Sequence, residues 1–288
     1  MKKESLIGSA CSILSAILFG FMPLMANPAF SSGSNAYTIA FGRFLTGSMF
    51  CAGMILLLPG YSFKIGKAQF LSLLKISLFF AVMPVLLYSS YDLIGAGMAT
   101  TLHFTYPAVV LIFTSVLLKR KPEWIKIICC ILCMSGICMI YHRGGGNVRG
   151  LVLAAFSGVV YACYIILFER SNLDGLPLIN TIFWISLFSS MEIGLYAMMT
   201  HKLLLNLPSS VWISYLALGI IAMVIATLLF QTGVLHCGSL KASLYSTLEP
   251  VTGVFVGVTF YHEAVDQMGF MGIILILASV IGLSIFGD

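Results

Sequence analysis

Two stretches decide the fold: residues 88–107, YSSYDLIGAGMATTLHFTYP, and residues 231–250, QTGVLHCGSLKASLYSTLEP. When their final prolines are superposed, an offset of 143 residues, Gly95 falls on Gly238 and the small residues between glycine and proline recur in the same order. The agreement lies in residue size and in the position of the proline more than in identity. It predicts an internal repeat.

The composition around these stretches excludes a soluble protein. Among the 288 residues, 60% belong to the AVILMFWYC set and only 9% are charged, against about 25% charged residues in a typical soluble domain. The mean hydropathy is +1.05. So little polar surface cannot cover a soluble globule, which excludes cytosolic enzymes, nucleic-acid binders and secreted disulfide-rich domains. We expect a polytopic membrane protein surrounded by lipid.

Apolar segments long enough to cross the membrane follow one another along the chain. A crossing helix needs about 20 mostly apolar residues, whereas strands of a membrane barrel are about 10 residues long and alternate in polarity. The sequence therefore predicts an all-α integral membrane protein with ten transmembrane helices. The expected segments are 6–25, 36–58, 70–89, 97–118, 124–141, 150–168, 178–199, 213–234, 241–260 and 267–286. The first is too long for the apolar region of a signal peptide, so we expect it to be retained.

The basic residues predict the orientation, because short cytoplasmic loops carry an excess of Lys and Arg. If the N-terminus is cytoplasmic, eleven basic residues face inward and three face outward. The inward set is Lys2, Lys3, Lys64, Lys67, Lys75, Lys119, Arg120, Lys121, Lys126, Arg170 and Lys241, and the outward set is Arg143, Arg149 and Lys202. We expect a multi-pass protein of the cytoplasmic (plasma) membrane with both termini in the cytoplasm.

The repeat and the segment count together predict two inverted five-helix repeats. The first repeat is expected over residues 1–143, a hinge loop over 144–149 and the second repeat over 150–288. Five crossings are an odd number, so the second repeat enters the membrane from the opposite side. Inverted repeats can rock against each other and open a central site to either side of the membrane. The architecture therefore favours a carrier.

An aromatic residue, a run of small residues and then a proline, present twice in a ten-helix chain, resemble the drug/metabolite transporter superfamily, EamA type. The resemblance covers the whole chain and implies a transporter rather than an enzyme, with export favoured. The family places an acid after each proline. Glu263 follows Pro250 in this way, but Arg120 replaces the acid after Pro107, so its role is not carried over to the first repeat. An arginine at the position of Arg43 also recurs in the family.

Glu249 is the first candidate site residue, because charged groups near mid-membrane are costly and mark functional sites by default. It lies about eight residues, or about 12 Å, into its segment at 1.5 Å per residue. Pro250 donates no backbone hydrogen bond, which predicts a free carbonyl on Ser246. A carboxyl group and a free carbonyl would suit a proton, a cation or an ammonium group. The alternative is that Glu249 caps or pairs with a neighbouring helix.

His103 and Tyr106 occupy the repeat positions of Ser246 and Glu249. Residues three apart share a helix face, and inverted symmetry would turn that face toward the same cavity. A lone histidine in an apolar helix is as often a hydrogen-bonded packing residue, and both interpretations remain open.

Arg43 and Glu192 lie at matching depths in the second and seventh segments. They could form a buried ion pair that closes the outer side, or Arg43 could hold a substrate carboxylate or phosphate by its planar fork. The sequence favours a site or gate role for Arg43 and leaves the choice open.

Further side chains are expected to complete a cavity. Tyr88 and Gln231 are equivalent positions of the two repeats, and an aromatic ring within a segment can stack on a substrate. The rings proposed for that role are those of Tyr161, Tyr164 and Trp184. Aromatic residues near helix ends are also common as interfacial anchors.

These residues predict a secondary transporter that moves a small polar metabolite, an amino acid or a related compound, by alternating access. Proton coupling and uncoupled exchange of a metabolite or cationic drug both remain open. An intramembrane enzyme would need a nucleophile and base or a metal site, and a scaffold would not need Glu249. No cofactor or nucleic-acid partner is expected. No metal site is expected either, because the C-x-x-C of Cys130 and Cys133 lies inside an apolar run without a histidine. The oligomeric state is left open.

Overall fold

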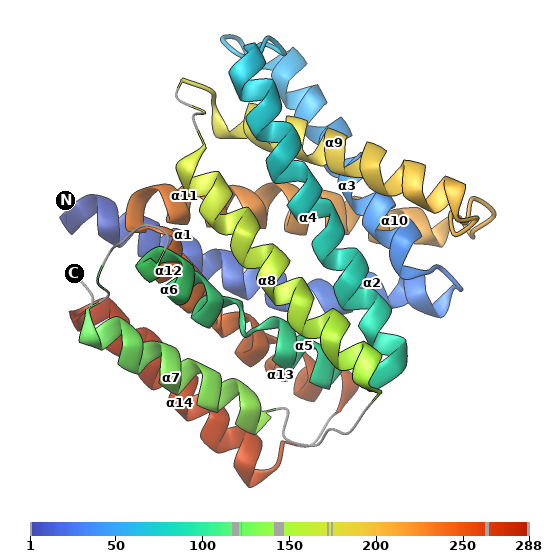
Figure 1. The fold of residues 1–288 in the computed structure, drawn as a ribbon. Coiled ribbons are helices and arrows are strands. Elements are labelled where there is room, and N and C mark those ends of the chain that lie inside the picture. Colours follow the sequence, from blue (N-terminus) through green and yellow to red (C-terminus); the bar gives the residue numbers. More distant parts are fainter. Residues whose placement is uncertain are drawn as a thin grey trace.

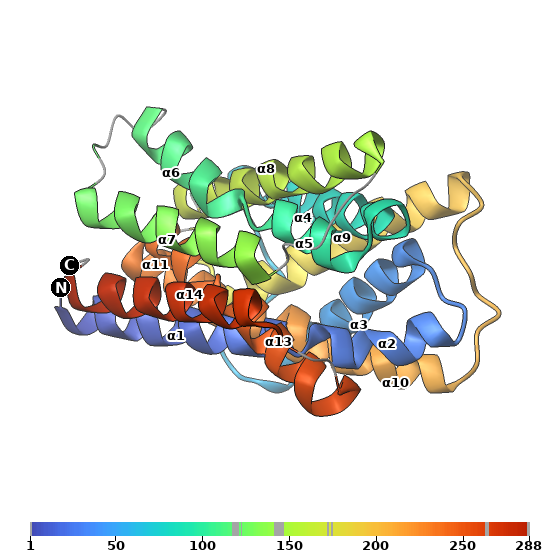
Figure 2. The same ribbon diagram turned by 90° about the horizontal axis from the view of Figure 1, so that it is seen from below.

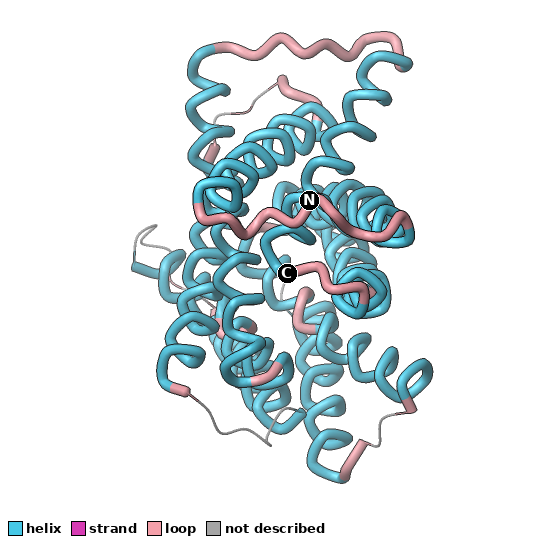
Figure 3. Tube along the Cα trace, turned by 90° about the vertical axis from the view of Figure 1, so that its right-hand side faces the viewer, coloured by secondary structure: helices cyan, strands magenta, loops and turns pink. Residues whose placement is uncertain are grey.

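The computed structural model describes residues 2–116, 121, 123–140, 147–171, 173, 175–262 and 265–286. Within these residues the chain forms helices joined by loops and turns, without a strand (Figure 3). Eight helical stretches in the described ranges are long and apolar enough to cross a membrane. The apolar helix α7 is shorter, at 17 residues. The predicted all-helical membrane fold is confirmed.

Figure 1 shows the helices in their order along the chain. They are α1 (Lys2–Gly20), α2 (Met22–Ser31), α3 (Ala36–Leu57), α4 (Lys67–Ile94), α5 (Ala96–His103), α6 (Tyr106–Val116), α7 (Trp124–Ile140), α8 (Val148–Arg170), α9 (Leu178–Met199), α10 (Ser210–Ala217), the π-helix η1 (Leu218–Ala226), α11 (Thr227–Cys237), α12 (Ser239–Tyr245), α13 (Leu248–Tyr261) and α14 (Gln267–Phe286).

Each expected segment holds one of these helices or a consecutive group. The first segment divides at Phe21, and two segments that are equivalent in the repeat are also broken. The fourth divides into α5 and α6, and the ninth divides into α12 and α13. Pro107 and Pro250 then lie in the first turns of α6 and α13, where a missing N–H costs no helical hydrogen bond. The expectation of continuous helices over 97–118 and 241–260 was wrong in this respect.

Glycines end the helices that precede both broken segments. Gly95 separates α4 from α5 with φ of 77°, and Gly238 separates α11 from α12 with φ of 84°. A side chain with a Cβ is disfavoured at such positive φ angles. Because these glycines are equivalent in the sequence repeat, the same backbone bend occurs at the same place in both halves.

The two halves run in opposite directions. The helix α1 starts at the end where both chain termini lie and runs away from it, whereas α8 runs toward that end (Figures 1 and 2). Each of these helices packs on the bend of the other half. A Cβ on Gly8 would lie 2.8 Å from Cβ of His236, and one on Gly150 would lie 2.7 Å from Cβ of Leu93. The inverted two-repeat fold is confirmed, while the boundaries at 143 and 150 stay a prediction because residues 144–146 lie outside the described residues.

Equivalent helices of the two halves also pack against each other. The helices α3 and α9 form one such pair, and α7 and α14 form another. A Cβ on Gly136 would lie 2.6 Å from the carbonyl oxygen of Gly272, and one on Gly272 would lie 2.5 Å from that of Gly136. Small residues let two helices approach closely in lipid. These pairs hold the two halves together around the space between them.

Candidate functional site

A cavity of about 910 Å³ lies between the two halves. Its wall comes from α1 to α7 on one side and from α8, η1, α11, α13 and α14 on the other, and most of it is apolar or aromatic. Six of the ten predicted site residues line this cavity: Arg43, Tyr88, His103, Tyr106, Tyr161 and Glu249. Small-molecule sites commonly occupy about 300–1,000 Å³ and carry a few polar groups in an apolar wall, which is the arrangement seen here.

Arg43 brings a positive charge into the cavity from α3. The side chain is buried, its guanidinium carbon lies 4.7 Å from the ring centre of Phe44, and Nη1 lies 3.8 Å from the sulfur of Met22. Its Nε is enclosed and has no hydrogen-bond partner. A buried donor without a partner is costly, so an acceptor within reach of the guanidinium would stabilise this arrangement.

Glu249 supplies the negative charge from the first turn of α13. That position lets the N-terminal end of the helix dipole favour a carboxylate. No direct ion pair joins Arg43 and Glu249 among the described residues. The cavity therefore presents groups of both signs, and Arg43 and Glu249 are not joined to each other by a salt bridge.

Aromatic rings surround the histidine that lines the cavity. The ring of His103 lies 5.5 Å from the rings of Tyr106 and Tyr161, measured between centres, and Tyr106 lies 4.8 Å from Tyr161. Nδ1 of His103 lies 2.9 Å from Oγ of Ser157 on α8. The cluster joins α5, α6 and α8 and forms a firm wall on the side of the first repeat.

The structure corrects the placement of three predicted cavity residues. Tyr164 is fully buried behind the wall and stacks on Phe80 at 4.5 Å between ring centres, and Nε2 of Gln231 donates to its hydroxyl over 3.2 Å. Trp184 packs between the rings of Phe183 and Phe188. Tyr164, Gln231 and Trp184 are absent from the cavity lining. A sequence gives depth along a helix but not the direction of a ring, which is why they were misplaced.

The structure also corrects the prediction that the backbone carbonyl of Ser246 is free. The N–H of Glu249 donates to it over 3.0 Å, closing the turn between α12 and α13. The prediction assumed an unbroken helix, in which only the N–H of residue 250 could reach that carbonyl. The side chain of Ser246 lies beside the phenol of Tyr106, so Ser246 supports the wall without lining the cavity.

Glu192 lies away from the cavity and does not pair with Arg43. Its Oε1 lies 2.9 Å from Oγ of Ser77 on α4, and its Oε2 is enclosed without a partner. Of the two alternatives for Arg43, the described residues therefore lack the ion pair with Glu192. Glu263 and Arg120, the acid of the second repeat and its counterpart in the first, lie outside the described residues.

Several cavity residues were not anticipated from the sequence. Asn27, Thr100, Thr227 and Asp266 contribute polar groups to the lining. Asn27 lies between the first two expected segments and precedes a proline, and Thr100 lies among the small residues of the repeat. No pattern in the sequence distinguishes these side chains from other polar residues at helix ends.

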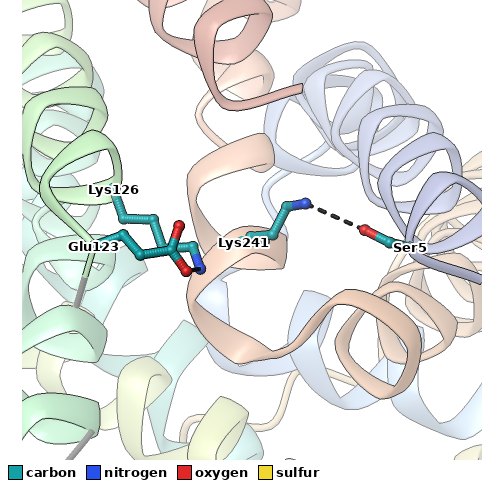
Figure 4. A network of polar contacts seen from close by, with 4 residues as sticks. All are labelled: Ser5, Glu123, Lys126 and Lys241. Carbon is teal, nitrogen blue, oxygen red and sulfur yellow. Dashed lines mark hydrogen bonds and ion pairs between the residues drawn. The ribbon is translucent and has the colours of Figure 1, made fainter. Parts of the chain in front are cut away.

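The end of the molecule that carries the termini is closed. There, both carboxylate oxygens of Glu169 accept hydrogen bonds from Ser239, from its N–H over 3.2 Å and from its hydroxyl over 2.7 Å. Nζ of Lys241 on α12 donates to Oγ of Ser5 on α1 over 3.2 Å, near the Glu123–Lys126 ion pair (Figure 4). These contacts join α12 to α8 and to α1.

The opposite end is open. Cavity residues there come from the end of α2, the start of α5 and the end of α13, and they include Phe30, Met98 and Val258. The helix α12 packs against α6 at the closed end, whereas the equivalent pair, α5 and α13, shows no comparable packing among the described residues. The cavity therefore opens away from the termini.

Comparisons with known proteins agree with this architecture. The model of the EamA-like transporter family matches the chain twice, over residues 6–142 and 148–285. An uncharacterized transporter of Archaeoglobus fulgidus is 22% identical over 274 residues, which cover 95% of each chain. An uncharacterized transporter of Synechocystis sp. is 26% identical over 208 residues, 68% of this chain and 61% of its own.

A solved crystal structure of a protein shares the fold, with a TM-score of 0.78 at 18% identity over 97% of this chain and 96% of that one. The predicted resemblance is confirmed by the family match, which covers most of both halves. The chain is a multi-pass membrane protein with a central cavity, and it belongs to the EamA-like transporter family.

Proposed function

We propose that this protein is a secondary transporter for a small polar metabolite that carries an ammonium and an acidic group, such as an amino acid or a related compound. The supporting observation is that Arg43 and Glu249 line the same cavity and do not form a direct ion pair with each other. Glu249 would attract the ammonium group and Arg43 would hold the carboxylate. The apolar and aromatic wall would accommodate the remainder of the substrate.

Transport would follow alternating access. The inverted halves give two related conformations, one closed near the termini and open at the other end, the second with these roles exchanged. From the excess of basic residues we propose that the termini lie in the cytoplasm, in the cytoplasmic membrane. The open end then faces outward. Export is the direction favoured by the family resemblance.

Proton coupling through Glu249 is part of the proposal, since a carboxyl group in apolar surroundings can exchange its proton for a cationic substrate. Uncoupled exchange of a metabolite or a cationic drug is the alternative. It would need no titrating group in the cavity, and the presence of Glu249 in the lining favours coupling.

Uptake into liposomes tests the proposal. The purified full-length chain is first screened for ligands that raise its apparent melting temperature, because a ligand stabilises the state it binds. Each binder is then offered to liposomes with and without a pH gradient, with empty liposomes as the control. Concentrative uptake that depends on the gradient supports coupled transport, and equal uptake without a gradient supports the uncoupled alternative. Binding without any uptake would reject the transporter.

A further inference from the structure

Ser157 contacts Nδ1 of His103, and this contact determines which ring nitrogen carries the hydrogen. Nδ1 of His103 lies 2.9 Å from Oγ of Ser157, and the same Oγ lies 2.6 Å from the carbonyl oxygen of Ala154. A serine hydroxyl has one hydrogen to donate, and a carbonyl oxygen can only accept. Ser157 therefore donates to Ala154 and accepts from His103, which places a hydrogen on Nδ1.

The other ring nitrogen, Nε2, is then an acceptor. A neutral imidazole with its hydrogen on Nδ1 carries an unshared electron pair on Nε2. Nε2 has no hydrogen-bond partner among the described residues, and it is not one of the enclosed polar atoms that lack one. Because His103 lines the cavity, this nitrogen is accessible from the cavity.

The surroundings of the ring favour its neutral form. The nearest aromatic rings are those of Phe104, Tyr106 and Tyr161, at 5.7, 5.5 and 5.5 Å between centres. The ring is only 6% exposed, and no described carboxylate forms an ion pair with it. A buried charge without a partner is strongly disfavoured, so the ring does not also bind a proton on Nε2.

The described residues at the equivalent positions of His103 and Ser157 lack such an acceptor. Ser246 stands at the equivalent of His103, and its hydroxyl donates to the carbonyl of Ala242 over 3.0 Å. When the first helices of the two repeats are superposed with Gly8 on Gly150, Ser15 falls on Ser157. The hydroxyl of Ser15 donates to the carbonyl of Ala226 over 2.7 Å. Both hydroxyls therefore donate their hydrogen to backbone carbonyls. The neutral acceptor at this level of the cavity comes from the first repeat.

We propose that His103 is a specificity-determining residue whose Nε2 accepts a hydrogen from the substrate, and that Ser157 is the positioning residue that keeps Nε2 unprotonated. Glu249 alone would attract any cation. An acceptor at His103 selects cations that have a hydrogen to donate, so the site takes primary and secondary ammonium compounds and rejects quaternary ammonium ions. This inference rests on the proposed function, in which Glu249 attracts the ammonium group.

A matched pair of ligands provides the first test: L-phenylalanine and its N,N,N-trimethyl betaine, which share charge, ring and carboxylate but differ in N–H donors. We expect the detergent-solubilised protein to bind the primary amine about tenfold more tightly, equivalent to one good hydrogen bond. Equal binding of the two compounds overturns this inference and leaves the proposed function standing. If neither compound binds, the inference and the amine-binding function fall together.

Variants of His103 and Ser157 distinguish a hydrogen-bond acceptor at Nε2 from a ring that only packs in the wall. In His103→Gln the amide can reach the former place of Nε2 and should keep part of the preference, whereas His103→Asn keeps only a group near Nδ1 and should lose it. Ser157→Ala should also lose the preference, because either ring nitrogen can then carry the hydrogen. Ser15→Ala, which removes an equally buried hydroxyl in the other repeat, is the matched control and should keep it.

The hydrogen position can be measured without a ligand. Nitrogen-15 spectra of histidine-labelled protein, with His103→Gln used to assign the signal, should show an unprotonated Nε2 in the unmodified chain and a mixture of ring forms in Ser157→Ala. A protonated Nε2 in the unmodified chain would overturn the proposal whatever the binding data show. The apparent melting temperature of each unliganded variant shows whether it is folded.

Discussion

The two broken helices, residues 95–116 and 238–261, share a backbone and differ in chemistry. Each begins at a glycine of positive φ, runs for two turns, breaks, and resumes at a proline. The first presents His103 and Tyr106 to the cavity, and the second presents Glu249. The repeated backbone supplies two matched arms, and the side chains on them supply different functions.

The two arms also differ in their contacts. The start of the second is bound to α1 through Lys241 and to α8 through Ser239, whereas the start of the first lines the open end of the cavity through Met98. An inverted pair with identical sequences would have equal free energies when open to either side. The difference in contacts therefore decides which end is closed.

The largest expected effect separates Glu249 from its equivalent, Tyr106. Glu249→Gln should reduce uptake about a hundredfold or more and abolish its dependence on a proton gradient, because a lost charge contact costs about 2–5 kcal/mol. Tyr106→Phe keeps the ring and should reduce uptake much less.

Glu192→Gln is the matched control for this prediction, since it removes a carboxylate from a span outside the cavity. Uptake into liposomes at two external pH values measures all three variants. An unchanged pH dependence in Glu249→Gln would remove this residue from the mechanism.

Arg43→Gln should have the next largest effect, and the effect should depend on the substrate. Loss of the guanidinium fork removes a charge-assisted hydrogen bond worth about 1.5–3 kcal/mol, so binding of an amino acid should weaken about tenfold or more. Binding of the corresponding amine without a carboxylate should change little. Calorimetric titration of both ligands checks this, and equal losses would indicate that Arg43 serves as a gate or in folding.

The contacts at the closed end should matter less for binding than for conformation. Glu169→Ala removes both acceptors of Ser239 and should favour opening of that end, raising the rate at which a water-soluble maleimide labels Cys237 nearby. The control is Glu123→Ala, whose carboxylate pairs with Lys126 at an exposed position. Mass spectrometry of the labelled peptide gives the rate, and equal rates in the two variants would mean that Glu169 does not hold the end closed.

The smallest expected effect compares the two bends. Gly95→Ala and Gly238→Ala should each destabilise the fold by about 1–2 kcal/mol, the cost of positive φ in a residue with a Cβ. Gly53→Ala, within α3 and with open space around its Cβ position, should instead stabilise by about 0.5–1 kcal/mol. Unfolding in detergent measures the three changes. A much larger loss at one bend would show that the two halves do not share the strain equally.

Several features of the fold follow from the sequence by local rules. The small fraction of charge requires lipid, the length of each apolar run requires a helix, and the odd number of crossings per repeat requires inversion. The match of Gly95 with Gly238 anticipated two equivalent positions, and both prove to be bends. The π-helix η1 was not anticipated, because its wider turn depends on packing: its last carbonyl, on Ala226, accepts a hydrogen bond from Ser15 of α1.

The site could be predicted only in part. Depth along a helix can be counted from residue numbers, so charged residues such as Arg43 and Glu249 were identified as candidates. The direction of a side chain around the helix depends on which neighbours pack against it, so Gln231, Tyr164 and Trp184 were expected in a cavity that they do not line. The role of Ser157 could not be predicted from the sequence, because it arises from one contact across two helices.

The sequence by itself determined that the protein lies in lipid, that it is helical, and that it contains two inverted repeats. Each of these properties depends on local composition or on the number and length of the apolar segments. The tertiary structure alone decided which polar groups meet and which end of the cavity is closed. Those properties depend on distances of a few ångströms between segments far apart in the chain, and such distances are set by the packing of all the helices together.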